Sequence, residues 1–198
     1  MTDADDEMPK TEDLVRAFQQ GAELSFDALY ERLAPALYAW TVLRAPRGIE
    51  PGDVLAETWL RAVRSVHEFD PGRASFRTWL FGIAKKVLLY ELRARARRRA
   101  LTERPDADSR TAGLERIPEA VTSLSVRLGR EESMARFLER INAFAREERE
   151  LVLYCGLEGS SCREAATRMG LSEQATLKRW QRLRAELRES SWAAQFLE

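Results

Sequence analysis

Apolar residues recur at intervals of three and four along almost every patterned stretch of this chain, which is the spacing of one face of an α-helix. The pattern runs through Leu14, Val15 and Phe18, and it returns in Phe137 and Ile141. Runs that alternate apolar and polar residues between hairpin turns are missing. The sequence therefore predicts an all-α fold, made of two small helical domains joined by a linker, with a helix-turn-helix as the C-terminal domain.

Breaks in the helical pattern divide the chain into five segments. A polar, acidic tail over residues 1–11 is expected to be disordered. A first helical domain is predicted over 12–99, a linker with prolines and charges over 100–129, and a second helical domain over 130–190. Residues 191–198 form a tail, for which a packed terminal helix is favoured over a regulatory or partner-binding element.

Charge is balanced over the 198 residues, with 32 basic and 32 acidic side chains, but it is segregated along the chain. Residues 1–31 carry a net charge of −7, residues 71–104 one of +8 and residues 163–188 one of +4. This segregation indicates separate surfaces, at least one of them suited to an anionic partner. The helix predicted over 76–99 ends in a cluster of arginines, more than a favourable interaction with the helix dipole explains. These arginines repel one another, and binding to a polyanion would relieve that repulsion.

Residues 161–189 have the pattern of a helix-turn-helix. Gly170 and Leu171 form the predicted turn, and Ser172 can cap the second helix. One face of that helix is apolar and is expected to pack inward: Thr176, Trp180, Leu183 and Leu187. The other face carries side chains that can bind base edges and phosphates: Gln174, Lys178, Gln181 and Arg182. DNA binding is favoured here over a plain helical hairpin with a solvated charged face.

The turn over residues 67–75 combines aromatic and basic side chains ahead of the helix predicted from Phe76. Stacking on aromatic rings beside positive charge is a way to hold unpaired bases. His67, Phe69 and Arg73 are the candidates for such contacts. Phe76 and Trp79 are expected to be core residues instead.

Several classes of function are disfavoured by composition. A lone histidine and two cysteines, Cys155 and Cys162, do not support a metal site or a disulfide framework, and the cysteines are expected to be free thiols rather than a redox pair. No catalytic triad or glycine-rich phosphate loop is present, so we expect no enzyme activity and no cofactor. With no long apolar run and no signal peptide, a cytoplasmic protein without membrane contact is expected.

Four stretches in order resemble the extracytoplasmic-function (ECF) group of bacterial sigma factors, in the sigma-70 family. They are FDALYERLAPALYAW (26–40), DVLAETWLRAV (53–63), FDPGRASFRTWLFGIAKKVLLYELR (69–93) and the helix-turn-helix. The resemblance implies a protein that directs RNA polymerase to specific promoters. It implies as partners core RNA polymerase, through the clamp helices of its largest subunit and its flap, promoter DNA, and an anti-sigma factor or other regulator.

The resemblance also assigns roles to individual residues. Docking on core polymerase is implied for Asp53, Leu55, Glu57 and Thr58. Recognition and melting of the −10 element are implied for His67, Phe69, Arg73, Ser75, Arg77, Lys85, Lys86, Tyr90, Arg93 and Arg97. Recognition of the −35 element is implied for Arg163, Ser172, Gln174, Ala175, Lys178, Arg179, Gln181 and Arg182.

Two other classes of function stay open at this point. The first is a stand-alone helix-turn-helix transcriptional regulator with an N-terminal effector domain. The second is a helical adaptor that binds only protein, which would leave both basic faces unexplained. The docking stretch 53–63 beside the aromatic turn favours the sigma factor over both.

Overall fold

The computed structural model describes residues 9–102, 132–190 and 193–197. Within these ranges the regular elements are all helices, which confirms the predicted all-α class. Most of the predicted linker over 100–129 lies outside the described residues, as do residues 1–8 of the predicted N-terminal tail.

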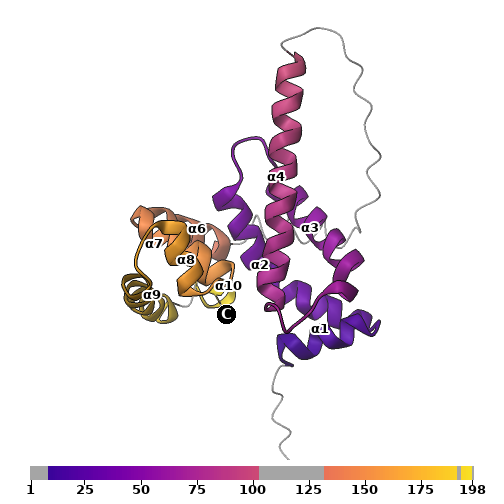
Figure 1. The fold of residues 1–198 in the computed structure, drawn as a ribbon, viewed down its shortest axis with the longest axis horizontal. Helices are drawn as coiled ribbons and strands as arrows, with labels where there is room; N and C mark the ends of the chain where they lie inside the picture. Colours follow the sequence, from indigo (N-terminus) through magenta and orange to yellow (C-terminus); the bar gives the residue numbers. More distant parts are fainter. Residues whose placement is uncertain (1–8, 103–131, 191–192, 198) are drawn as a thin grey trace, which may run out of the picture.

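The N-terminal half is a bundle that ends in one long helix. Its elements are α1 (Thr11–Gln19), α2 (Glu23–Arg44), α3 (Pro51–Ser65), the single 3₁₀ turn η1 (Val66–Glu68) and α4 (Phe76–Thr102). α2 and α3 pack beside the N-terminal part of α4, whose C-terminal end projects beyond the other helices (Figure 1). The arginine-rich end of α4 therefore lies where solvent surrounds it.

The start of α4 follows the turn that the sequence predicts. Asp70 accepts two hydrogen bonds in this turn. The Gly72 amide donates to its side-chain Oδ1 (2.9 Å), and the Arg73 amide donates to its backbone carbonyl oxygen (3.1 Å). Ser75 then caps α4, because its Oγ accepts from the Thr78 amide at 3.2 Å. One side of α4 is apolar and faces the core: Phe76, Leu80, Ala84, Val87 and Leu88 are buried, and Trp79 and Ile83 are half-buried.

The C-terminal half consists of short helices. They are α6 (Glu132–Ala143), α7 (Arg146–Leu151), the π-helical segment η2 (Val152–Leu157), α8 (Cys162–Met169), α9 (Glu173–Arg188) and α10 (Ala194–Leu197). Gly156 in η2 is in close contact with the side chains of Leu197 and Trp180. A Cβ atom there would be 2.6 Å from Leu197 and 3.2 Å from Trp180, so the close packing requires glycine.

The two halves share one apolar core in the described residues. α2 contacts α6, η2 and α10, so the C-terminal helices gather along its side (Figure 1). Phe196 in α10 is fully buried, with its ring 4.2 Å from the ring of Phe137. The described part of the tail is thus a packed terminal helix, the favoured alternative. The residue boundaries of the two domains stay a prediction.

Candidate nucleic-acid interface

The turn before α4 exposes two of its three predicted base-binding residues. The side chains of His67 and Arg73 are 70% and 87% exposed. Phe69, in contrast, is only 7% exposed, and its ring contacts those of Phe76 and Trp79 at 5.4 Å each. In this structure the Phe69 ring closes the aromatic core, and its contact with a base stays a prediction. The backbone reverses its direction in the turn FDPG, residues 69–72, and the buried Phe69 ring packs this turn against the core.

The predicted −10 residues of α4 fall into two groups, and a further one, Ser75, directly precedes the helix. Lys86, Tyr90, Arg93 and Arg97 are exposed, and the Arg61 guanidinium lies 5.8 Å from the centre of the Tyr90 ring. Ser75 is exposed but serves as the helix cap. Arg77 and Lys85 instead contact the C-terminal half: Arg77 donates to the Phe196 carbonyl oxygen (2.9 Å), and Lys85 Nζ donates to Glu158 (2.5 Å).

The predicted docking residues of α3 also divide by burial. Asp53 is exposed, and Glu57 is half-exposed and accepts a hydrogen bond from Arg61 (2.6 Å). Leu55 and Thr58 are completely buried, and the Thr58 hydroxyl donates to the Val54 carbonyl oxygen. Both side chains lie in the core of this structure, and their docking role stays a prediction. Asp53 and Glu57 remain candidates.

Helices α8 and α9 form the predicted helix-turn-helix. Gly170 ends α8 in the left-handed conformation (φ 67°), which glycine adopts without strain, and Ser172 Oγ caps α9 by accepting from the Ala175 amide. Thr176, Leu183 and Leu187 are buried, as the apolar stripe predicts, and Trp180 is half-buried. The sequence therefore predicted both the turn and the inner face of α9.

The predicted −35 residues lie on or beside the outer face of α9. Gln174, Lys178 and Gln181 are exposed, and Ala175 is half-buried. Three of the predicted arginines have acidic partners: Arg163 pairs with Glu173 (3.2 Å), Arg179 with Glu147, and Arg182 with Glu148 (3.7 Å). Since these pairs are exposed, each contributes about 0–1 kcal/mol and DNA phosphates can replace the carboxylates.

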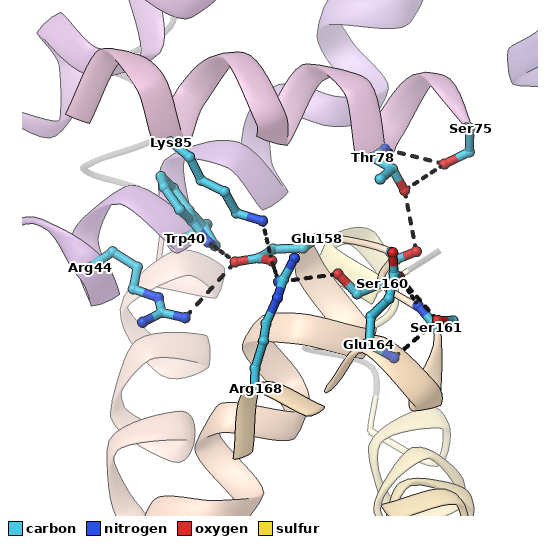
Figure 2. Close-up of polar contacts among 11 residues, drawn as sticks. Trp40, Arg44, Ser75, Thr78, Lys85, Glu158, Ser160, Ser161, Glu164 and Arg168 are labelled. Atoms are coloured by element: carbon cyan, nitrogen blue, oxygen red, sulfur yellow. Dashed lines mark hydrogen bonds and ion pairs between the residues drawn. The ribbon is translucent and has the colours of Figure 1, made fainter. Parts of the chain in front are cut away.

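A buried glutamate that sequence reasoning missed joins the two halves. Glu158 is 1% exposed and follows η2, and Figure 2 shows its carboxylate surrounded by side chains from α2, α4 and α8. Trp40 Nε1 donates to Oε1 (2.8 Å), while Lys85 Nζ (2.5 Å) and Arg168 (2.8 Å) donate to Oε2. Arg44 lies 3.9 Å from Oε1. No local pattern predicts this cluster, because its members are distant in sequence.

Burying a carboxylate costs several kcal/mol unless charged groups and hydrogen-bond donors compensate for the lost water. Here three cations and an indole N–H surround it. The cations are themselves partly exposed, with 33% of the Arg44 side chain and 37% of the Lys85 side chain open to solvent. Removing a single cation would thus leave the carboxylate less well compensated, and removing the carboxylate would leave several cations facing one another.

The turn after Glu158 carries a capping box that the sequence signals as Ser161-x-x-Glu164. Ser161 Oγ accepts from the Glu164 amide (3.2 Å), and the Ser161 amide donates to Glu164 Oε2 (2.9 Å). The Ser161 hydroxyl also donates to Glu164 Oε2 (3.0 Å), and the hydrogen bonds from the Ser161 amide and hydroxyl to this carboxylate hold the pKa of Glu164 below its usual value. The pattern was available in the sequence, and it fixes where α8 begins.

The two cysteines are free and half-buried in the structure, and their thiols are neighbours. Burial, together with the neighbouring Cys162, raises the pKa of Cys155 to about 12. A thiol with so high a pKa is a poor nucleophile at neutral pH.

Among the described residues, no cluster of histidine, cysteine and carboxylate side chains could hold a metal ion. No helix in the described ranges is long and apolar enough to cross a membrane.

Comparison with known proteins points to one family. The model of sigma-70 region 2 matches residues 29–98, which span most of α2, all of α3 and most of α4. The ECF RNA polymerase sigma factor BldN of Streptomyces coelicolor is 27% identical over 172 residues, which cover 87% of this chain and 62% of BldN. The RNA polymerase sigma factor NccH of Alcaligenes xylosoxydans xylosoxydans is 28% identical over 177 residues, covering 89% of this chain and 91% of NccH.

A third relative, the ECF sigma factor SigE of Mycolicibacterium smegmatis, is 28% identical, and the alignment covers 86% of this chain and 63% of SigE. The chain thus spans less than two thirds of the length of BldN and of SigE. A solved structure of CnrH in complex with the cytosolic domain of CnrY matches at 24% identity, covering 90% of this chain and 95% of that one, with a TM-score of 0.45.

The family model assigns a sigma-70 region 2 domain to residues 29–98. Residues 29–98 match sigma-70 region 2, and the relatives that align along most of the chain are sigma factors, two of them of the ECF group. The resemblance carried by the four sequence stretches is therefore confirmed.

Proposed function

We propose that this chain is a sigma factor that gives core RNA polymerase its promoter specificity in the bacterial cytoplasm. The observation that carries the proposal is the match of residues 29–98 to sigma-70 region 2, which contains both the exposed acids of α3 and the basic face of α4. The helix-turn-helix of α8 and α9 supports it, because a second DNA-reading element follows in the same chain.

The exposed residues suggest a division of tasks. Asp53 and Glu57 on α3 dock on core polymerase, while Arg73 and the exposed α4 residues Lys86, Tyr90 and Arg93 hold the −10 element. The outer face of α9 reads the −35 element as duplex, since a helix of this kind fits the major groove. An anti-sigma factor stays a prediction of the resemblance.

Run-off transcription tests this function. The full chain is added to purified core polymerase with a pool of promoter fragments, and the expected result is transcription from a defined subset that core polymerase alone does not start. The chain by itself should bind the same duplexes weakly, because its −10 contacts need unpaired bases. Tight binding to palindromic duplex by the chain alone, with no run-off product, would support the stand-alone regulator instead.

The docking assignment has its own test. Asp53 and Glu57 are four residues apart on α3, so their carboxylates lie on one side of the helix. Changing both to lysine should abolish binding to core polymerase, measured by co-purification, while circular dichroism stays helical. The matched control changes Asp27 and Glu31, exposed acids four apart on α2, and should bind normally. Unchanged binding by the α3 variant would refute the docking role.

A further inference from the structure

One side of α4 is covered by the C-terminal half. Besides the contacts of Arg77 and Lys85, the Thr78 hydroxyl donates to the Gly159 carbonyl oxygen at 3.3 Å (Figure 2). Residues 77, 78 and 85 lie on one side of the helix, because seven residues make about two turns. The segment that follows η2 and the helix α10 therefore occupy a face that contains two of the predicted −10 residues.

The partners of Glu158 belong to different halves of the molecule. Arg168 lies on α8, in the same half as Glu158, so this pair can persist if the halves separate. Trp40, Arg44 and Lys85 lie on α2 and α4 and are brought to the carboxylate only by the packing of the halves. Separation would leave an indole N–H and two cations together, without the carboxylate that now neutralises them.

We propose that Trp40, Arg44 and Lys85 form a binding site for a backbone phosphate of single-stranded DNA, and that Glu158 fills this site in the closed chain as an intramolecular competitor. The proposal rests on the proposed function in taking DNA as the ligand. The docked C-terminal half then inhibits DNA binding by α4 until the halves separate.

The chemistry of the site matches a phosphodiester. A phosphate oxygen accepts hydrogen bonds as a carboxylate oxygen does, and arginine, lysine and indole N–H groups are all donors. The guanidinium groups of Arg44 and Arg168 also lie 5.1 and 5.2 Å from the centre of the Tyr154 ring. A cleft of about 520 Å³ adjoins the carboxylate between α4 and η2, and gives a strand room to approach.

The test measures binding of the free full chain to a labelled single-stranded oligonucleotide of about 16 nucleotides, by fluorescence anisotropy over a range of salt concentrations. In Glu158→Gln the side chain keeps its shape and still accepts from Trp40, but its charge is gone. We expect this variant to bind about tenfold more tightly than the unchanged chain, with a salt slope steeper by about two, one for each cation of the proposed site, Arg44 and Lys85. Adding Arg44→Gln should reverse most of the gain.

The matched control is Glu150→Gln, which removes the same charge from the same half and affects only a pair with Arg146 inside α7. It should bind as weakly as the unchanged chain. Equal affinity of Glu158→Gln and the control, or a gain that Arg44→Gln leaves intact, would overturn the proposal. Inorganic phosphate at constant ionic strength should leave the tight binding within twofold. Displacement by phosphate would mean a site for small anions and would overturn the assignment to DNA.

A second variant covers the case in which Glu158→Gln does not fold. Glu158→Asp keeps the charge but draws the carboxylate back from Trp40 and Lys85, so it should also raise affinity for the oligonucleotide. No gain by folded Glu158→Asp would then refute the proposal. Because these assays contain no polymerase, their failure beside successful run-off transcription would refute only this inference. A gain that depends on Arg44, without any run-off activity, would refute only the sigma factor function.

Discussion

Ser161 is the residue whose contribution to stability is easiest to isolate. Replacing it with alanine removes the cap of α8, and we expect the free energy of unfolding to fall by about 1 kcal/mol. Urea denaturation at neutral pH measures this change. Ser190→Ala is the control, because the Ser190 hydroxyl only donates to a carbonyl oxygen at the end of α9. An equal loss in both variants would contradict the importance of the capping box.

The capping box of Ser161 and Glu164 also makes the stability of α8 depend on pH. The pKa of Glu164 is lowered in the folded chain, so its contribution is present above the unfolded pKa of about 4.3 and is lost as the pH falls through the lower folded value. The Ser161 amide, which Ser161→Ala keeps, is the larger cause of the lowered pKa, and the Ser161 hydroxyl is the smaller one. The difference between the unchanged chain and Ser161→Ala should therefore shrink in part below about pH 4. A constant difference from pH 7 to pH 3 would contradict this coupling.

Phe69 and Arg73 lie in one turn but should respond differently to mutation. Phe69→Ala removes a buried ring and should lower the free energy of unfolding by about 3–5 kcal/mol. Arg73→Ala, at an exposed position, should change it by less than about 0.5 kcal/mol. Only Arg73→Ala is then a clean probe of strand opening, and a pre-melted template should restore its run-off activity. Equal stability of the two variants would show that Phe69 is not a core residue.

At the scale of elements, α9 carries the clearest prediction. Lys178 and Arg182 are exposed and four residues apart, so changing both to alanine should lower promoter occupancy roughly ten- to hundred-fold while the helix stays folded. Footprinting on duplex promoter measures the loss. Arg184→Ala with Arg188→Ala is the matched control on the later turns of α9 and should have a smaller effect. A pre-melted template should not rescue the Lys178 and Arg182 changes, and a full rescue would contradict duplex reading by α9.

The elements were predictable where the signal was local. The 3–4 spacing predicted α4 and the inner face of α9, and the capping serines gave their starts. The burial of Thr58 inside α3 and of Phe69 in the turn was less predictable: both fall in stretches that match a functional pattern, yet tertiary packing encloses them. The Glu158 cluster was not predictable at all, because its partners lie 10 to 118 residues away along the chain.

At the scale of the molecule, the shared core predicts how the chain unfolds. Buried apolar residues of the two halves form one continuous cluster, in which Phe137 and Phe196 pack close to α2. We expect a single thermal transition in calorimetry, with equal calorimetric and van't Hoff enthalpies. In Glu158→Gln the transition should broaden or split, because the halves are no longer joined by the buried charge cluster. Two separate transitions in the unchanged chain would contradict a shared core.

The π-helical segment η2 sets the rotational position of Glu158. The Glu158 amide donates to the Leu153 carbonyl oxygen five residues earlier (3.0 Å), where an ordinary α-helix would use the residue four earlier. Deleting one residue from η2 would let the backbone wind as a normal α-helix and would rotate the residues C-terminal to the deletion by about 100°. The carboxylate would then point away from Arg44 and Lys85, although no residue of the cluster had changed. Related chains that differ here by one insertion or deletion would thus keep their helices but lose the contacts of Glu158 with Arg44 and Lys85 that join the two halves.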